Sequence, residues 1–121
     1  MDRKERGNDA ELATARYLRK QGLTIDRRNF HCRRGELDII ARDHETVVFV
    51  EVRARRNNAM VNPIESIGYS KQRRLISAAS YYIHRFRLHE QPCRFDVVGV
   101  TVQSDGTHQF QWIRNAFDAS L

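Results

Sequence analysis

The sequence predicts an α/β fold in which a central mixed β-sheet is flanked by helices. Two β-rich runs, residues 36–41 and 46–53, are separated by a short polar stretch of the kind that closes a hairpin. A helical pattern precedes them, and a second helical pattern is followed by two more β-rich runs. The order helix, three strands, helix, two strands favours helices packed on a single sheet.

The first helix is expected to begin near residues 8–9, where Asn or Asp can cap it, and to end at Gly22. On this helix Glu11, Ala15 and Leu18 follow the spacing i, i+4, i+7 and share one face. Glu11 is either an acid placed favourably in the first helical turn or a carboxylate that points inward. The helical pattern alone favours neither interpretation.

The first strand is predicted over residues 23–29, and it leads into a basic stretch that ends at Arg33 and Arg34. We expect this stretch to be a loop and Gly35 to allow a sharp turn into the next strand. The two arginines either belong to a solvated surface or bind phosphates, since backbone contacts supply most sequence-independent affinity for nucleic acid.

Glu51 is the anomaly of the hairpin, because it interrupts a strongly apolar run. A buried carboxylate without a partner costs several kcal/mol, so Glu51 is expected to face a cation. Asp38 on the preceding run is a candidate co-ligand for that cation. Strand alternation predicts the two faces of each run. In the first run, one face carries Glu36, Asp38 and Ile40, and the other carries Leu37, Ile39 and Ala41. In the second run, one face carries Val48, Val50 and Val52, and the other carries Phe49, Glu51 and Arg53.

Residues 54–68 form the longest stretch without a helical or strand pattern. Arg55, Arg56, Asn57 and Asn58 would suit a lid over nucleic acid, and an ordinary exposed loop is the alternative.

A second helix is expected over residues 70–87, with a core-facing stripe formed by Leu75, Ala79, Tyr82, Ile83 and Phe86. Lys71 lies one turn before the stripe, on the same side. It is either a surface lysine with a buried stem or a phosphate contact. Strands over residues 94–102 and 109–113 complete the fold.

Composition limits the function classes. A chain of 121 residues is expected to form one domain, 1–121. The net charge of +6 predicts a polyanionic partner, although ribosome-associated proteins share this signature. Without a signal-peptide core or an apolar run of membrane-spanning length, we expect a cytoplasmic protein with no membrane partner. Cys32 and Cys93 are expected to be free thiols.

Asp38 followed by Glu51-Val52-Arg53 resembles the motif of PD-(D/E)XK nucleases. Over nearly the whole chain, further segments are similar to the YraN family of small predicted endonucleases, which is akin to the archaeal Holliday-junction resolvases. These segments are Glu11-x-x-x-Ala15-x-x-Leu18, Arg28-Asn29, Gly35-Glu-x-Asp38, Phe49-Val-Glu51-Val, Lys71, Arg94-Phe-Asp96-Val and Asn115-Ala-Phe117.

The resemblance implies a restriction-endonuclease-like sandwich and metal-dependent hydrolysis of DNA, including branched or junction DNA. It implies that Mg²⁺ or Mn²⁺ is bound by Asp38, Glu51, Glu11 and the main-chain carbonyl of Val52. The same three acids and Arg53 would be the catalytic residues. The nucleic-acid contacts would come from Arg33, Arg34, Arg55, Arg56, Lys71 and Arg74.

Arg53 stands where the nuclease motif has Lys. Arginine supplies charge but does not deprotonate, so the residue is expected to act only electrostatically. This departure keeps two alternatives open: a nucleic-acid-binding module with a degenerate site, and a protein-interaction domain in which Glu51 and Arg53 form a structural pair. A homodimer, and RNA in place of DNA, are also left open.

Overall fold

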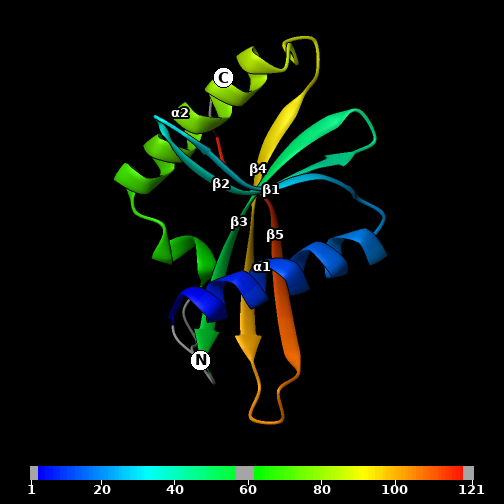
Figure 1. The fold of residues 1–121 in the computed structure, drawn as a ribbon, viewed down its shortest axis with the longest axis vertical. Coiled ribbons are helices and arrows are strands. Elements are labelled where there is room, and N and C mark those ends of the chain that lie inside the picture. The colour runs from blue at the N-terminus through cyan, green and yellow to red at the C-terminus, as the bar shows by residue number, and fades with distance from the viewer. Residues whose placement is uncertain (1–2, 57–61, 119–121) are drawn as a thin grey trace.

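A computed structural model describes residues 3–56 and 62–118 of the chain, in which a five-stranded mixed sheet lies between two helices (Figure 1). The predicted α/β fold and its order of elements are confirmed, and the architecture is consistent with a restriction-endonuclease-like sandwich. The elements are α1 (Arg3–Lys20), β1 (Thr24–Cys32), β2 (Gly35–Asp43), β3 (Thr46–Arg56), the 3₁₀ helix η1 (Pro63–Ser66), α2 (Tyr69–Arg85), β4 (Cys93–Val102) and β5 (His108–Phe117).

The strands lie in the sheet in their chain order, β1-β2-β3-β4-β5. Neighbouring strands are antiparallel except β3 and β4, which are parallel. The connection between these two strands contains α2, because parallel neighbours need a long crossover.

Each helix covers one face of the sheet. Leu18 of α1 packs with Val48 and Val50, whereas Leu75 of α2 packs in a second cluster with Phe49. The predicted alternation of β3 is therefore confirmed. The predicted stripe of α2 is also confirmed: its residues are buried in the second cluster, except Phe86, which is partly buried against it.

Only the N-terminal end of α1 differs from the prediction. The helix begins at Arg3, several residues earlier than expected. It ends at Lys20, and Gly22 adopts a positive φ of 103°. The Leu23 amide donates to the Leu18 carbonyl at 3.0 Å, which is the bond expected when glycine closes a helix.

Two predicted loops are shorter than the sequence indicates. Strand β1 continues to Cys32, so only Arg33 and Arg34 form the turn before Gly35. Residues 54–56 belong to β3, because they pair with residues 100–102 of β4. Residues 63–66 form η1, while Asn57 and Asn58 lie outside the described residues.

The free state of both cysteines is confirmed. Within the described ranges, neither helix is long and apolar enough to cross a membrane.

Candidate active site

The candidate site lies where the pairing of β2 with β3 ends. The paired residues run as far as Ile39 and Val50, and β3 then continues beside β4 alone. The Val52 amide, which has no β2 residue opposite it, donates to Oδ2 of Asp38 at 2.9 Å. The Asp38 carboxylate thus accepts the hydrogen bond that a β2 carbonyl would accept if the strand pairing continued. This bond fixes the carboxylate in position.

Asp38 also lies where the alternation of β2 breaks. Leu37 packs in the α2 cluster and Ile39 in the α1 cluster, although residues two apart in a regular strand share a face. The prediction that Leu37 and Ile39 lie on the same face is therefore wrong. Opposite Asp38 on β1 is Asn29, with a positive φ of 55° that asparagine tolerates better than most residues.

Glu51 is buried, as its position in the sequence predicts, with 6% of its surface exposed. Its Oε2 has no hydrogen-bond partner in the described structure, and Nζ of Lys71 lies 4.0 Å from it. Burial, together with repulsion from and hydrogen bonding to the Asp38 carboxyl, raises the pKa of Glu51 to about 9. Lys71 and Arg53 act in the opposite direction, but too weakly to keep Glu51 ionised at neutral pH.

Glu11 reaches the same site from α1. Its Oε1 is buried and has no hydrogen-bond partner among the described residues. Burial, followed by repulsion from Asp38, raises the pKa of Glu11 to about 7, while Arg28 lowers it. Carboxyl groups from α1, β2 and β3 therefore interact around Asp38, and Oε1 of Glu11 points inward; its role in binding a metal stays a prediction. Arg28 was missed as a site residue, although it lies next to Asn29 in the sequence motif.

Arg53 is held by η1. Its Nε donates to Oγ of Ser66 at 2.9 Å, and its Nη2 donates to the Ser66 carbonyl at 3.1 Å. Ser66 Oγ in turn donates to the Pro63 carbonyl at 2.6 Å. The guanidinium is thus oriented by two bonds to one residue while its charge still acts on Glu51. Ser66 was missed because nothing in its local sequence connects it to a residue thirteen positions earlier.

The remaining predicted cations are spread over the molecule. Lys71 lies beside Glu51, and Arg55 lies two residues beyond Arg53 on the same strand. Arg74 is exposed on α2. The side chain of Arg56 lies outside the described part of the chain.

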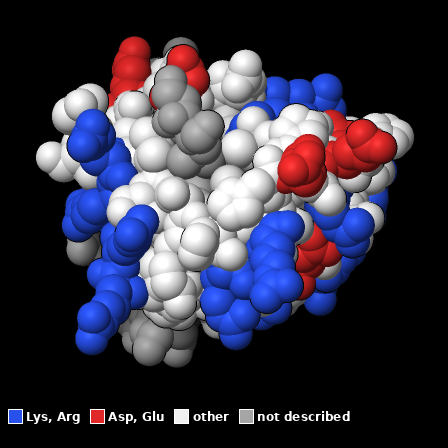
Figure 2. All heavy atoms as spheres, turned by 90° about the horizontal axis from the view of Figure 1, so that it is seen from above, with Lys and Arg blue, Asp and Glu red and all other residues white. Residues whose placement is uncertain are grey.

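Arg33 and Arg34 are exposed at the turn between β1 and β2. Arg34 lines an open hollow of about 350 Å³ together with Ser80, His84 and His89, near the C-terminal end of α2. Lys and Arg side chains form separate groups on the face shown in Figure 2, divided by a band of other residues. Positive charge on this face therefore does not form one continuous patch.

The donor chemistry of the site suits a hard divalent cation. Carboxylate oxygens are the ligands that Mg²⁺ and Mn²⁺ prefer, and those of Glu11 and Glu51 include atoms without hydrogen bonds. The N–H and C=O of one strand residue point to the same side, so the Val52 carbonyl lies on the Asp38 side of β3. Over residues 3–56 and 62–118, no group of three or more His, Cys, Asp or Glu side chains is arranged to hold a metal ion. Binding would therefore require the carboxyl side chains to turn toward one another.

Comparison with known proteins identifies the family. Residues 10–100 match the family described as "Uncharacterised protein family UPF0102". A UPF0102 protein of Chromohalobacter salexigens is 49% identical over 121 residues, covering 98% of this chain and 94% of the relative. A UPF0102 protein of Alcanivorax borkumensis is 47% identical over 116 residues, covering 95% and 93%. One from Pseudomonas aeruginosa is 46% identical over 119 residues, covering 96% and 94%. The chain therefore belongs to the UPF0102 family, the YraN family that its motifs resemble.

Proposed function

We propose that this protein is a metal-dependent nuclease that hydrolyses phosphodiester bonds in DNA, including branched DNA. The observation that carries the proposal is that the Asp38 charge acts on both Glu11 and Glu51, each of which has a buried carboxyl oxygen without a hydrogen bond among the described residues. Such an arrangement is costly in a metal-free protein, and strongly shifted pKa values of this kind are typical of functional sites.

Asp38, Glu51, Glu11 and the Val52 carbonyl would hold Mg²⁺ or Mn²⁺. When bound, the ion would supply a water molecule of lowered pKa and neutralise charge on the phosphodiester. Glu11 and Glu51 would release protons on binding, because only their ionised forms are strong ligands. Asp38 needs little reorganisation, since the Val52 amide already orients it.

Arg53 would stabilise the charge that develops on the phosphate in the transition state. Its guanidinium stays protonated, so it serves as a fixed positive charge and not as a base. The two bonds to Ser66 use donors on one side of the guanidinium and leave others for a phosphate oxygen. Lys71 would supply a second positive charge beside Glu51.

A nucleic-acid-binding module that does not cut is the second candidate. Arg53 in the place of the motif's Lys favours it, and the bonds from Arg53 to Ser66 are compatible with a purely structural arginine. The two candidates agree on DNA binding and differ only in cleavage.

The deciding experiment incubates the wild type with branched, flapped, single-stranded and linear DNA in Mn²⁺ or EDTA. We expect cleavage only with Mn²⁺, and none by Asp38→Asn, which should still bind DNA. Asp26→Asn, which alters an exposed carboxylate paired with Arg42, is the matched control and should cut like the wild type. A wild type that cuts no substrate, or an Asp38→Asn protein that still cuts, would contradict the proposal.

A further inference from the structure

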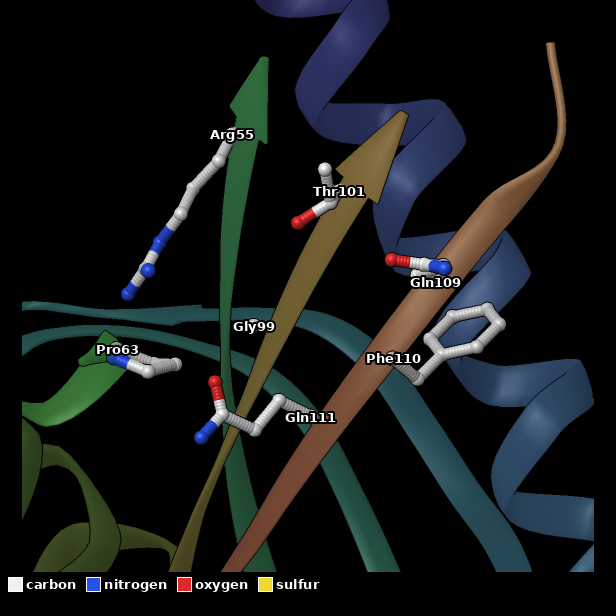
Figure 3. A pocket seen from close by; sticks show the side chains of 7 residues that line it. All are labelled: Arg55, Pro63, Gly99, Thr101, Gln109, Phe110 and Gln111. Carbon is white, nitrogen blue, oxygen red and sulfur yellow. The ribbon is translucent and has the colours of Figure 1, made fainter. Parts of the chain in front are cut away.

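A small polar pocket lies beside Arg53 on the α2 side of the sheet. Its volume is about 140 Å³. It is lined by Arg55, Pro63, Gly99, Thr101, Gln109, Phe110 and Gln111. In Figure 3 the side chains of Arg55, Pro63 and Gln111 surround Gly99, while the Phe110 ring lies away from them.

The register of three strands builds this pocket. Arg53 pairs with Gly99, which pairs with Gln111, and the next row contains Arg55, Thr101 and Gln109. Their sequence neighbours Val52, Val98, Val100, Phe110 and Trp112 pack in the α1 cluster. Because side chains alternate, both rows point to the opposite face, which also carries Glu51. The pocket therefore continues the candidate active site along the same face of the sheet.

Gly99 determines the depth of the pocket. A Cβ atom at this position would lie 2.5 Å from Cγ of Pro63, so only glycine lets the proline ring sit against the strand. The floor is thus backbone and proline ring, while the rim carries hydroxyl, amide and guanidinium groups. An apolar floor with a polar rim suits a flat ring that has hydrogen-bonding groups on its edge.

The two glutamines indicate what kind of ring. A side-chain amide offers both donors and acceptors, as base edges do, whereas a phosphate offers only acceptors. Within the part of the chain that the structure describes, neither Gln109 nor Gln111 makes a side-chain hydrogen bond, and both are exposed. A ligand can therefore bind their amides without breaking a hydrogen bond within the described structure.

The size and position of the pocket limit the ligand further. At about 140 Å³ the pocket is small, which suits a single flat ring such as one base. Arg55 lies about 7 Å from Arg53 along β3, a distance that one unstacked nucleotide can bridge. A base within a duplex would first have to leave its stack to enter.

We propose that this pocket binds one unpaired nucleobase of the strand whose phosphodiester lies at Asp38 and Glu51. The inference rests on the proposed nuclease function and assigns its substrate class: DNA with an unpaired nucleotide next to the cleaved bond. Gln109, Gln111 and Thr101 bind the base edge, and Arg55 lies at the rim toward the backbone.

The test compares wild type and Gln109→Ala/Gln111→Ala by fluorescence anisotropy in EDTA. Two oligonucleotides of equal length are used, one a mixed-sequence single strand and the other fully abasic. We expect the double variant to bind the mixed strand about tenfold more weakly than the wild type does, because two base-edge hydrogen bonds are lost. Affinity for the abasic strand should be unchanged, because its phosphates are intact. Gln91→Ala, an exposed glutamine before the opposite end of β4, should bind both strands like the wild type.

Equal losses on both strands, or no loss on either, would overturn the pocket as a base site. Cleavage in Mn²⁺ is measured separately on the same proteins. If no substrate is cut but the variant still loses affinity only for the mixed strand, the nuclease function fails and the base site stands. If the wild type cuts DNA and the variant binds normally, only the base site fails. Absence of binding to either strand would overturn the base site, and the cleavage assay would then decide the nuclease function by itself.

Discussion

At the scale of single residues, the site consists of acids held in unfavourable surroundings. Glu51 is buried, faces Asp38 and has an oxygen without a hydrogen bond in the described structure. Its surroundings therefore favour the protonated form until a cation replaces the proton. Stability of the metal-free protein and metal binding should consequently depend on the same carboxyl group.

Glu51→Gln should make the metal-free protein more stable at alkaline pH. The unfolded state releases the Glu51 proton near pH 4.5, whereas the folded state retains it until about pH 9. The free energy of unfolding of the wild type should therefore fall as pH rises through this window. The variant lacks this dependence, so it should match the wild type near pH 4 and exceed it by a few kcal/mol at pH 8.

Urea unfolding in EDTA at several pH values measures this difference, and melting with added Mn²⁺ measures the metal contribution. Mn²⁺ should raise the melting temperature of the wild type but not of Glu51→Gln. The exposed Glu45, replaced by Gln, is the control and should change neither quantity. Parallel pH profiles for wild type and Glu51→Gln would show that Glu51 is not held in its protonated form.

Arg53→Lys should lower the cleavage rate even though it keeps the charge. Lysine cannot reproduce the two bonds by which the guanidinium is oriented on Ser66. Ser66→Ala removes only the bond to Oγ and keeps the carbonyl acceptor, so it should have a smaller effect of the same kind, with little loss of DNA affinity. In a double-mutant cycle the combined variant should be no slower than Arg53→Lys alone, because the bond to Oγ is already lost when the guanidinium is replaced. Additive losses in kcat would mean that Ser66 does not position Arg53.

At the scale of elements, the short helix η1 positions Arg53 in the site. It is capped by Asn62, whose Oδ1 accepts from the Ile64 amide at 2.9 Å. Ile67, which follows it, is buried in the α2 cluster, and Pro63 rests on Gly99. These contacts fix Ser66, and through it Arg53, relative to β4.

Gly99→Ala should displace η1 and thereby reduce cleavage. The new Cβ overlaps Cγ of Pro63, and such overpacking costs about 1–3 kcal/mol. Adding Pro63→Ala removes the overlapping atom, so the double variant should recover most of the lost stability. Thermal melting and nicking assays test both proteins. Gly7→Ala, on α1 with open space around it, should be neutral or slightly stabilising. A Gly99→Ala protein as stable and active as the wild type would refute the role of this contact.

At the scale of the whole molecule, a second buried acid, Asp96 on β4, connects β2 with β5, the strands on either side of the parallel pair β3 and β4. Asp96 is 1% exposed and accepts hydrogen bonds from Arg94, Trp112 and Asn115 at 2.9–3.0 Å. Arg94 also contacts Asp43 at the end of β2, at 3.0 Å. Unlike Glu51, Asp96 has a hydrogen bond to each oxygen, so its role is structural.

Asp96→Ala should destabilise the whole domain by about 3–5 kcal/mol, since it leaves Arg94 and two further part-buried donors without their acceptor. Asp96→Asn retains one acceptor oxygen and should cost less. Chemical unfolding measures both changes, with Asp105→Ala in the exposed turn before β5 as the control. An Asp96→Ala protein within 1 kcal/mol of the control, a difference typical of surface substitutions, would exclude a structural role.

Much of this architecture was predictable from the sequence, because it depends on neighbouring residues. Strand alternation placed Glu51 on the same face of β3 as Phe49, helical spacing identified the buried stripe of α2, and Gly22 marked the end of α1. An acid within an apolar strand was sufficient to indicate the centre of the candidate site, since burial follows from the surrounding residues.

Contacts between distant segments were decided only by the tertiary structure. Local alternation could not predict that the pleat breaks at Asp38 opposite Asn29, that Ser66 holds Arg53, or that Pro63 requires glycine at position 99. The pocket formed by Gln109 and Gln111 likewise depends on the register of three strands. Side-chain geometry at these positions is set by partners far along the chain, and the spacing of residues in sequence carries no information about which partners meet.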